Sequence, residues 1–173
     1  MKRSLYIILT TILAFASVNA FGQEKKPVFK KYYWGTPYEE IQAGEYREGT
    51  FGPGTITFSD VVAGLECNVT YKLVNGRLNE VYIIFTNTHE IEEENGFYKD
   101  FEAVNEYLNL FYGQPLFCGP NWKTSEDVKK EEIDKAMLEG KVSFIGRWQS
   151  KTASVLHYLT ARNLEFEHIV TIK

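Results

Sequence analysis

The sequence has few residues of the types that carry metal or nucleophilic chemistry. Only three histidines and two cysteines occur among its 173 residues. The Cys-x-x-Cys spacing of many zinc and redox sites is missing, as are the His-Glu-x-x-His and Gly-x-Ser-x-Gly patterns of zinc proteases and serine hydrolases. Glycines cluster between Gly49 and Gly54, but no Lys-Ser or Lys-Thr pair directly follows, which disfavours a phosphate-binding loop. We therefore expect a protein that is not an enzyme and needs no cofactor.

Long apolar runs are also scarce, and the clearest lies at the N-terminus. Two basic residues precede an apolar stretch over residues 5–15, and mainly small or weakly polar residues follow up to Ala20. A stretch of about a dozen residues is shorter than the roughly 20 that cross a bilayer as a helix. This order of regions is typical of a secretory signal peptide. The sequence thus predicts a signal over residues 1–20, a periplasmic or secreted domain over residues 21–173, and no membrane-spanning segment after cleavage.

Positive charge is in deficit. The chain has 23 acidic against 19 basic residues and a formal net charge of −4, and loss of Lys2 and Arg3 with the signal makes the remainder more acidic. An acidic surface is repelled by phosphates, so we expect neither nucleic acid nor an anionic membrane as partner. Aromatic residues, in contrast, are abundant: 11 Tyr, 12 Phe and 3 Trp. Such residues favour strands and protein-binding surfaces.

The two cysteines, Cys67 and Cys118, leave two interpretations open. In an oxidising compartment the pair can form a disulfide, which would close a loop of about 50 residues and constrain the unfolded chain. The alternative is two buried free thiols. Metal ligation by these cysteines is less favoured because they lack a paired short spacing.

The strongest local signal is Asn75-Gly76, which favours a two-residue hairpin turn because both positions tolerate positive φ. The flanking strands then pair so that Cys67 lies opposite Ile84. In this register the core face carries Leu65, Cys67, Val69, Tyr71, Leu73, Leu78, Tyr82 and Ile84. Val81 and Phe85 fall on the opposite, outward face of the predicted hairpin.

A second hairpin is predicted at the C-terminus, with Arg162-Asn163 as its turn between residues 153–161 and 164–172. This register places His157 directly opposite His168 on a face that is otherwise apolar. Two interpretations stay open for the histidines. They form a neutral pair within the core, or they contribute to a metal or ligand site that would need a third donor.

Apolar residues on the outward faces of both hairpins predict a contact surface. Tyr158 and Ile169 in the last hairpin join Val81 and Phe85 in the first. An antiparallel sheet often leaves one face to solvent, so apolar residues there need a partner or a cover. A helix or a second protomer that covers them is the alternative to a ligand.

A long helix separates the two hairpins, because apolar residues recur at helical period at Phe97, Phe101, Val104, Leu108 and Phe111. The whole chain predicts a short helix, three strands, a long helix with a peripheral one, and three more strands. This order predicts an α+β fold with antiparallel sheet or sheets covered by helices. It also suggests a tandem α-β-β-β repeat with halves at residues 32–95 and 96–173.

Two short segments add a resemblance to this element order. They are Trp34-Gly35-Thr36-Pro37-Tyr38-Glu39-Glu40-Ile41 at a helix start and Tyr112-Gly113-Gln114-Pro115 at a helix end. Over residues 32–173 the chain resembles small exported Gram-negative proteins of unknown function with the tandem helix-plus-antiparallel-sheet arrangement of β-lactamase-inhibitory-protein-like folds. The resemblance implies a protein-binding or envelope role, and it carries over no catalytic residue.

Two functional hypotheses follow. The first is an exported, non-enzymatic protein that binds an unknown protein or envelope component through its sheet. The second is a metal- or ligand-binding protein, or an enzyme, that uses His157 and His168. An exposed sheet face with aromatic residues favours the first, and a pocket that joins both histidines to a carboxylate favours the second.

Overall fold

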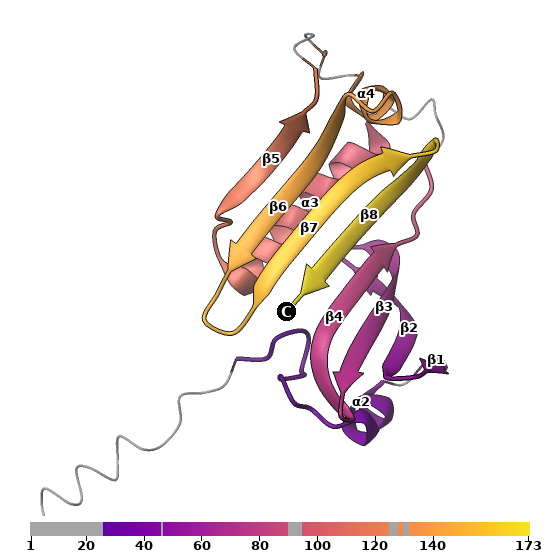
Figure 1. The fold of residues 1–173 in the computed structure, drawn as a ribbon, viewed down its shortest axis with the longest axis vertical. Helices are drawn as coiled ribbons and strands as arrows, with labels where there is room; N and C mark the ends of the chain where they lie inside the picture. Colours follow the sequence, from indigo (N-terminus) through magenta and orange to yellow (C-terminus); the bar gives the residue numbers. More distant parts are fainter. Residues whose placement is uncertain (1–25, 46, 90–94, 125–127, 130–131) are drawn as a thin grey trace, which may run out of the picture.

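The computed structural model describes residues 26–45, 47–89, 95–124, 128–129 and 132–173, so the predicted signal peptide lies outside the described residues. The fold class is confirmed as α+β, with one eight-stranded antiparallel sheet and three helices packed on it (Figure 1). The helices are α2 (Tyr38–Gly44), α3 (Gly96–Tyr112) and α4 (Ile133–Leu138). The strands are β1 (Gly49–Gly52), β2 (Thr55–Val62), β3 (Leu65–Val74), β4 (Arg77–Phe85), β5 (Phe117–Trp122), β6 (Val142–Gln149), β7 (Ser154–Arg162) and β8 (Glu165–Ile172).

The sheet is symmetric in its strand order, β1-β2-β3-β4-β8-β7-β6-β5. Each half of the chain supplies a helix and four strands, and in the second half α4 lies between β5 and β6. The last strands of the two halves, β4 and β8, pair at the centre. The predicted count of three strands per half is therefore wrong by one. The missed strands β1 and β5 both lie at an edge. Glycine in β1 and Gly119-Pro120 in β5 weaken the strand signal, and proline is tolerated at an edge because one side of the strand is unpaired.

The Asn75-Gly76 turn is confirmed, with φ values of 52° and 73° and Val74 opposite Arg77. Beyond the turn the register shifts by one residue between Lys72 and Leu73, which leaves Asn79 as an extra residue in β4. Such a β-bulge reverses the faces of every later residue on the bulged strand. Val81 and Phe85 consequently lie on the helix-covered face with 0% and 7% exposure, so their predicted outward placement is wrong. Tyr82 and Ile84, which we expected in the core, take the outer face instead, and Ile84 is 39% exposed.

The C-terminal hairpin turns one residue later than expected, at Asn163-Leu164, where both residues have positive φ. Every pair therefore shifts by two residues, and His168 lies opposite Leu159 instead of His157. A shift of two preserves the face of each side chain, because strands alternate with period two. His157 and His168 are thus diagonal neighbours on the predicted core face.

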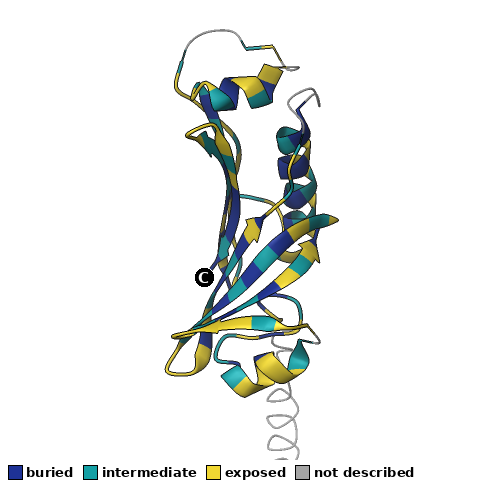
Figure 2. Ribbon diagram, turned by 90° about the vertical axis from the view of Figure 1, so that its right-hand side faces the viewer, coloured by how far each residue is buried: buried dark blue, intermediate teal, exposed yellow. Residues whose placement is uncertain are grey.

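The long helix α3 lies against β6 and β7. Phe101, Val104 and Leu108 of the predicted apolar stripe are buried, whereas Phe111 near the helix end is 55% exposed. Figure 2 shows α3 on one side of the sheet in a side view. Helix α4 packs beside it through Met137, which is fully buried. The buried side chains of α2, α3 and α4 pack in core clusters on the same face of the sheet. Among the described residues, no helix therefore covers the opposite face.

The cysteine pairing predicted as one alternative is wrong. Cys67 lies in β3 and Cys118 in edge strand β5, with β4, β8, β7 and β6 between them. At about 4.8 Å per strand their backbones lie roughly 24 Å apart, far beyond the ~7 Å limit for a disulfide. Both cysteines are free; Cys67 is buried and Cys118 is exposed. None of the helices in the described ranges is long and apolar enough to span a membrane.

Candidate functional site

The sheet face opposite the helices, which we call the open face, carries a row of apolar side chains. The backbone pairing places Ile145 of β6 next to Tyr158 of β7, and Tyr158 next to Ile169 of β8. Ile169 in turn pairs with Ile84 of β4. Four apolar residues from four adjacent strands thus form one cross-strand row, in which each Cβ atom lies about 5 Å from the next.

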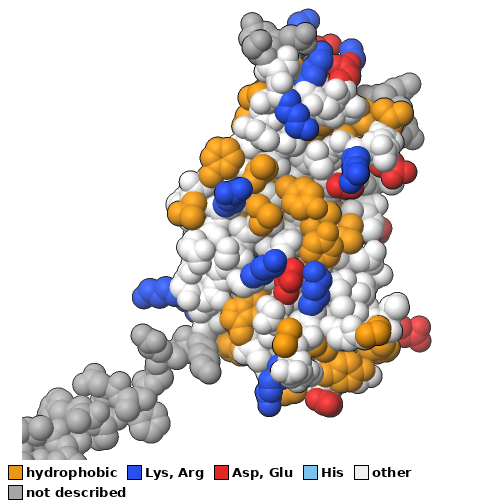
Figure 3. Space-filling model, in the orientation of Figure 1, with side chains coloured by type: hydrophobic (Ala, Val, Ile, Leu, Met, Phe, Trp, Pro, Cys, Tyr) orange, Lys and Arg blue, Asp and Glu red, His pale blue; other side chains and the backbone are white. Residues whose placement is uncertain are grey.

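A second row runs beside the first and extends it to the sheet edge. Here Leu156 of β7 pairs with Arg147 of β6, and Arg147 pairs with Phe117 of β5. Phe117 is 49% exposed and Leu156 is 38% exposed. Leu156 also pairs with Thr171 of β8, which pairs with Tyr82 of β4. We call the seven apolar residues of the two rows the apolar band: Phe117, Ile145, Leu156, Tyr158, Ile169, Tyr82 and Ile84. Figure 3 faces this side of the molecule and shows hydrophobic side chains gathered across its middle.

Charged residues flank the band. On one side, Lys72 and Lys173 lie around a single carboxylate, with Glu80 Oε1 at 3.2 Å from Lys72 Nζ and 3.9 Å from Lys173 Nζ. On the other side are Glu66 and Glu167, both exposed. Neither of these two acids has an ion-pair partner among the residues that the structure describes. The band therefore has an acidic border and a border with excess positive charge.

Sequence reasoning placed two of the four predicted contact residues on the correct face. Tyr158 and Ile169 lie on the open face, although the neighbouring side chains leave Ile169 only 7% exposed. Partial burial and the Tyr82 hydroxyl raise the pKa of Tyr158 to about 12, so its phenol stays neutral at pH 7 and can donate a hydrogen bond. The residues missed include Tyr82 and Ile84, because of the bulge, and Phe117 in an unpredicted strand. Ile145 lies on the open face because burial alternates along β6, with Val142, Phe144 and Trp148 on the core face.

The two buried histidines form a hydrogen-bonded chain with α3. His157 Nδ1 lies 2.8 Å from Asn105 Oδ1, and His157 Nε2 lies 2.7 Å from His168 Nε2. Because an amide oxygen only accepts, Nδ1 of His157 must donate, and its Nε2 then accepts from His168. Phe101 stacks on the His157 ring at a centroid distance of 4.3 Å, and Phe85 lies 4.3 Å from the His168 ring.

Burial keeps this pair neutral. It lowers the pKa of His168 to about 3, and burial together with the neighbouring His168 lowers the pKa of His157 well below its ordinary value. Asn105 and the histidines themselves occupy both nitrogens of His157. No group of three His, Cys, Asp or Glu side chains that could hold a metal ion is found in the described part of the chain. The arrangement is that of a hydrogen-bonded core pair.

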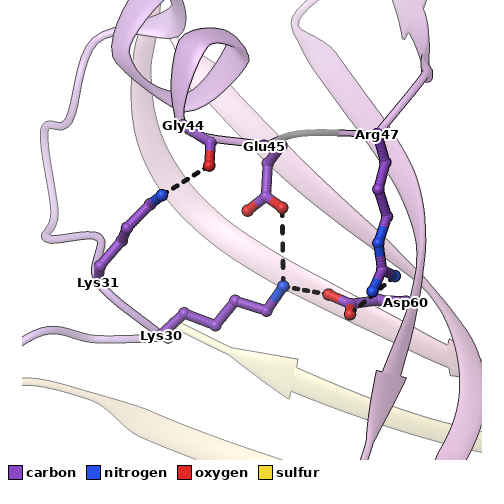
Figure 4. A pocket seen from close by; sticks show the side chains of 6 residues that line it. All are labelled: Lys30, Lys31, Gly44, Glu45, Arg47 and Asp60. Carbon is purple, nitrogen blue, oxygen red and sulfur yellow. Dashed lines mark hydrogen bonds and ion pairs between the residues drawn. The ribbon is translucent and has the colours of Figure 1, made fainter.

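A charged cavity of about 290 Å³ lies between the N-terminal segment, the end of α2 and β2 (Figure 4). Lys30 forms an ion pair with Asp60 and lies 3.8 Å from Glu45, while Arg47 reaches Asp60 at 3.0 Å. Burial alone would raise the pKa of Asp60, but the hydrogen bond and charge of Lys30 hold it below its ordinary value. Lys31 Nζ donates to the Gly44 carbonyl at 2.6 Å. The charges of Lys30 and Arg47 are thus balanced by those of Glu45 and Asp60. Together with the Lys31 hydrogen bond, these ion pairs hold residues 28–32 against α2 and the sheet.

Comparison with known proteins adds no family to this description. No protein-family model, no curated protein and no solved structure matches the chain.

Proposed function

We propose that this is an exported, non-enzymatic binding protein that contacts a protein partner through the apolar band of its open face. The observation that carries the proposal is the cross-strand row of Ile145, Tyr158, Ile169 and Ile84 on the open face. Antiparallel sheets usually bear polar residues on such a face. Contiguous apolar groups there, of which Ile84, Leu156 and Phe117 are 39%, 38% and 49% exposed, are typical of interaction surfaces. The element order that resembles β-lactamase-inhibitory-protein-like folds supports the same proposal.

The composition of the band also supports a protein partner. Its tyrosine, phenylalanine, leucine and isoleucine residues, with Arg147 beside them and charges at the border, match the apolar core and polar rim of protein interfaces. The row of aromatic and branched side chains is held on rigid strands, so little side-chain freedom is lost on binding. An envelope component with an apolar surface would use the same contacts.

A pair of lysine substitutions tests the proposal. Leu156→Lys places a charge in the band, and Leu110→Lys is the matched control, because Leu110 is 84% exposed on α3. We expect the wild type and Leu110→Lys to retain the same co-purifying protein from envelope extract, and Leu156→Lys to lose at least about nine-tenths of it, the effect of a 1.4 kcal/mol loss in affinity. Quantitative mass spectrometry of the captured fractions measures this. Equal capture by all three proteins, at equal thermal stability, would contradict the proposal.

A further inference from the structure

The pairing register places six residues on one line across the sheet, perpendicular to the strands. Each is the direct backbone partner of the next: Cys118, Gly146, His157, Val170, Ile83 and Val69. Alternation directs these positions to the helix-covered side, so the open face carries the residues just before and just after them. We call this line the mid-line, because the two rows of the apolar band lie on its two sides.

Two acid–base pairs on this face lie symmetrically about the mid-line, with opposite signs on its two sides. On β8, Glu167 precedes Val170 by three residues and Lys173 follows it by three. On β3, Glu66 and Lys72 bracket Val69 in the same way. At ~3.3 Å per residue each charge lies about 10 Å from the mid-line. The same acid-to-base order thus occurs on two strands, with only β4 between them.

We propose that the occupant of the open face is a second copy of this chain, related by a two-fold axis parallel to the mid-line. The inference rests on the proposed function, because it names the partner for the same surface. A half-turn about such an axis places the row of Ile145, Tyr158 and Ile169 over the Arg147, Leu156 and Thr171 row of the second copy. It also places Glu167 over Lys173 of the second copy, and Glu66 over its Lys72. Four acid–base contacts would then border the paired apolar bands.

The charges select this axis over the other face-to-face arrangement. A two-fold axis parallel to the strands would bring the acidic border of one copy against the acidic border of the other. The axis along the mid-line instead brings unlike borders together, and like charges in opposition are disfavoured. It also aligns the strands of the two sheets antiparallel, within reach of the roughly 30° crossing of aligned sheet packing. Among the described residues, Lys72 and Lys173 share Glu80 as their one acidic partner, so this border carries one more positive than negative side chain for the second copy.

The small area of the open face indicates a weak dimer. From β3 to β5 the face is roughly 24 Å wide, and from the acidic to the basic border it is roughly 20 Å high. This is below the ~800 Å² per subunit of a standard stable interface. We therefore expect a dissociation constant in the micromolar range, with attraction that weakens as salt is raised.

A charge-swap series measured by sedimentation equilibrium, from about 1 to 500 µM purified protein, tests the inference. Glu167→Lys and Lys173→Glu each place like charges together and should raise the dissociation constant at least about tenfold. The double variant Glu167→Lys/Lys173→Glu restores unlike pairs and should return to within about threefold of the wild type. Glu106→Lys, the same charge change on the helix side, should leave association unchanged.

Two results would overturn the second-copy assignment. One is a wild type that stays monomeric at 500 µM. The other is a double variant that associates no better than the single variants, since a face-to-face pair must recover when both charges are exchanged. If the chain is monomeric but Leu156→Lys still loses a captured protein, the second-copy inference fails while the proposed function stands. If the charge swap recovers dimers while capture from envelope extract does not depend on Leu156, the second-copy inference stands and the proposed binding of a different protein fails.

Discussion

His157 and His168 show how two polar rings are accommodated within an apolar core at the scale of single residues. Asn105 fixes the tautomer of His157, which fixes the donor role of His168. The sequence predicted that the two rings share the core face, because both fall among alternating apolar residues. It could not predict Asn105, since nothing in the spacing of α3 identifies which polar residue would face the sheet.

The pair makes stability depend on pH. Both histidines have a folded pKa below the unfolded value near 6.5, so the unfolded chain binds more protons as the pH falls. The two neutral histidines contribute their full stabilisation above pH 7, and this contribution is lost as the pH falls toward about 3. Once both histidines are protonated in the unfolded chain, the free energy of unfolding falls by up to roughly 3 kcal/mol per pH unit. Urea unfolding at pH 7 and pH 5 measures this difference in free energy.

The matched variants isolate the pair from other titrating groups. His157→Gln/His168→Gln should lose most of the decrease between pH 7 and pH 5, whereas His89→Gln, at the third histidine, should retain it. A wild type whose unfolding free energy is equal at the two pH values would contradict a buried neutral pair.

At the scale of elements, turns and bulges decided which sequence predictions held. Asn75-Gly76 fixed the first turn, yet the extra residue Asn79 reversed the faces of Val81 and Phe85. A bulge leaves no signature in alternation, because both faces of β4 are apolar enough to fit either assignment. The last turn lies at Asn163-Leu164 and not at the predicted Arg162-Asn163. The sequence did not indicate it, because leucine seldom adopts positive φ.

Leu164 provides a test of that turn. Its φ is 66° and its side chain is 79% exposed, so the backbone is strained and little burial compensates. Leu164→Gly should raise the free energy of unfolding by about 1 kcal/mol, because glycine adopts this conformation without steric cost. Leu164→Ala removes the side chain but keeps the strain, and it should give no such gain in chemical denaturation. Destabilisation by glycine beyond that of alanine would contradict the turn.

At the scale of the whole molecule, the order of helices and strands was sufficient to predict an antiparallel α+β fold. The sequence did not predict that the two halves join into one sheet through β4 and β8. The pairing of distant strands depends on packing that local sequence patterns do not record. The same joining creates the open face, because the apolar band combines residues of β4 with residues of β5 to β8. The candidate surface is therefore a property of the assembled sheet.

Site-specific photo-crosslinking tests the open face most directly. Benzoylphenylalanine replaces Phe117 in the band or, as a control, Phe111 on α3; the two side chains are 49% and 55% exposed. On irradiation in envelope extract or in concentrated purified protein, we predict a discrete adduct from position 117 and none from position 111. Mass spectrometry of the adduct then identifies another protein or a second copy of the chain. Adducts from position 111 alone, or no adduct from position 117 in either setting, would contradict binding through the open face.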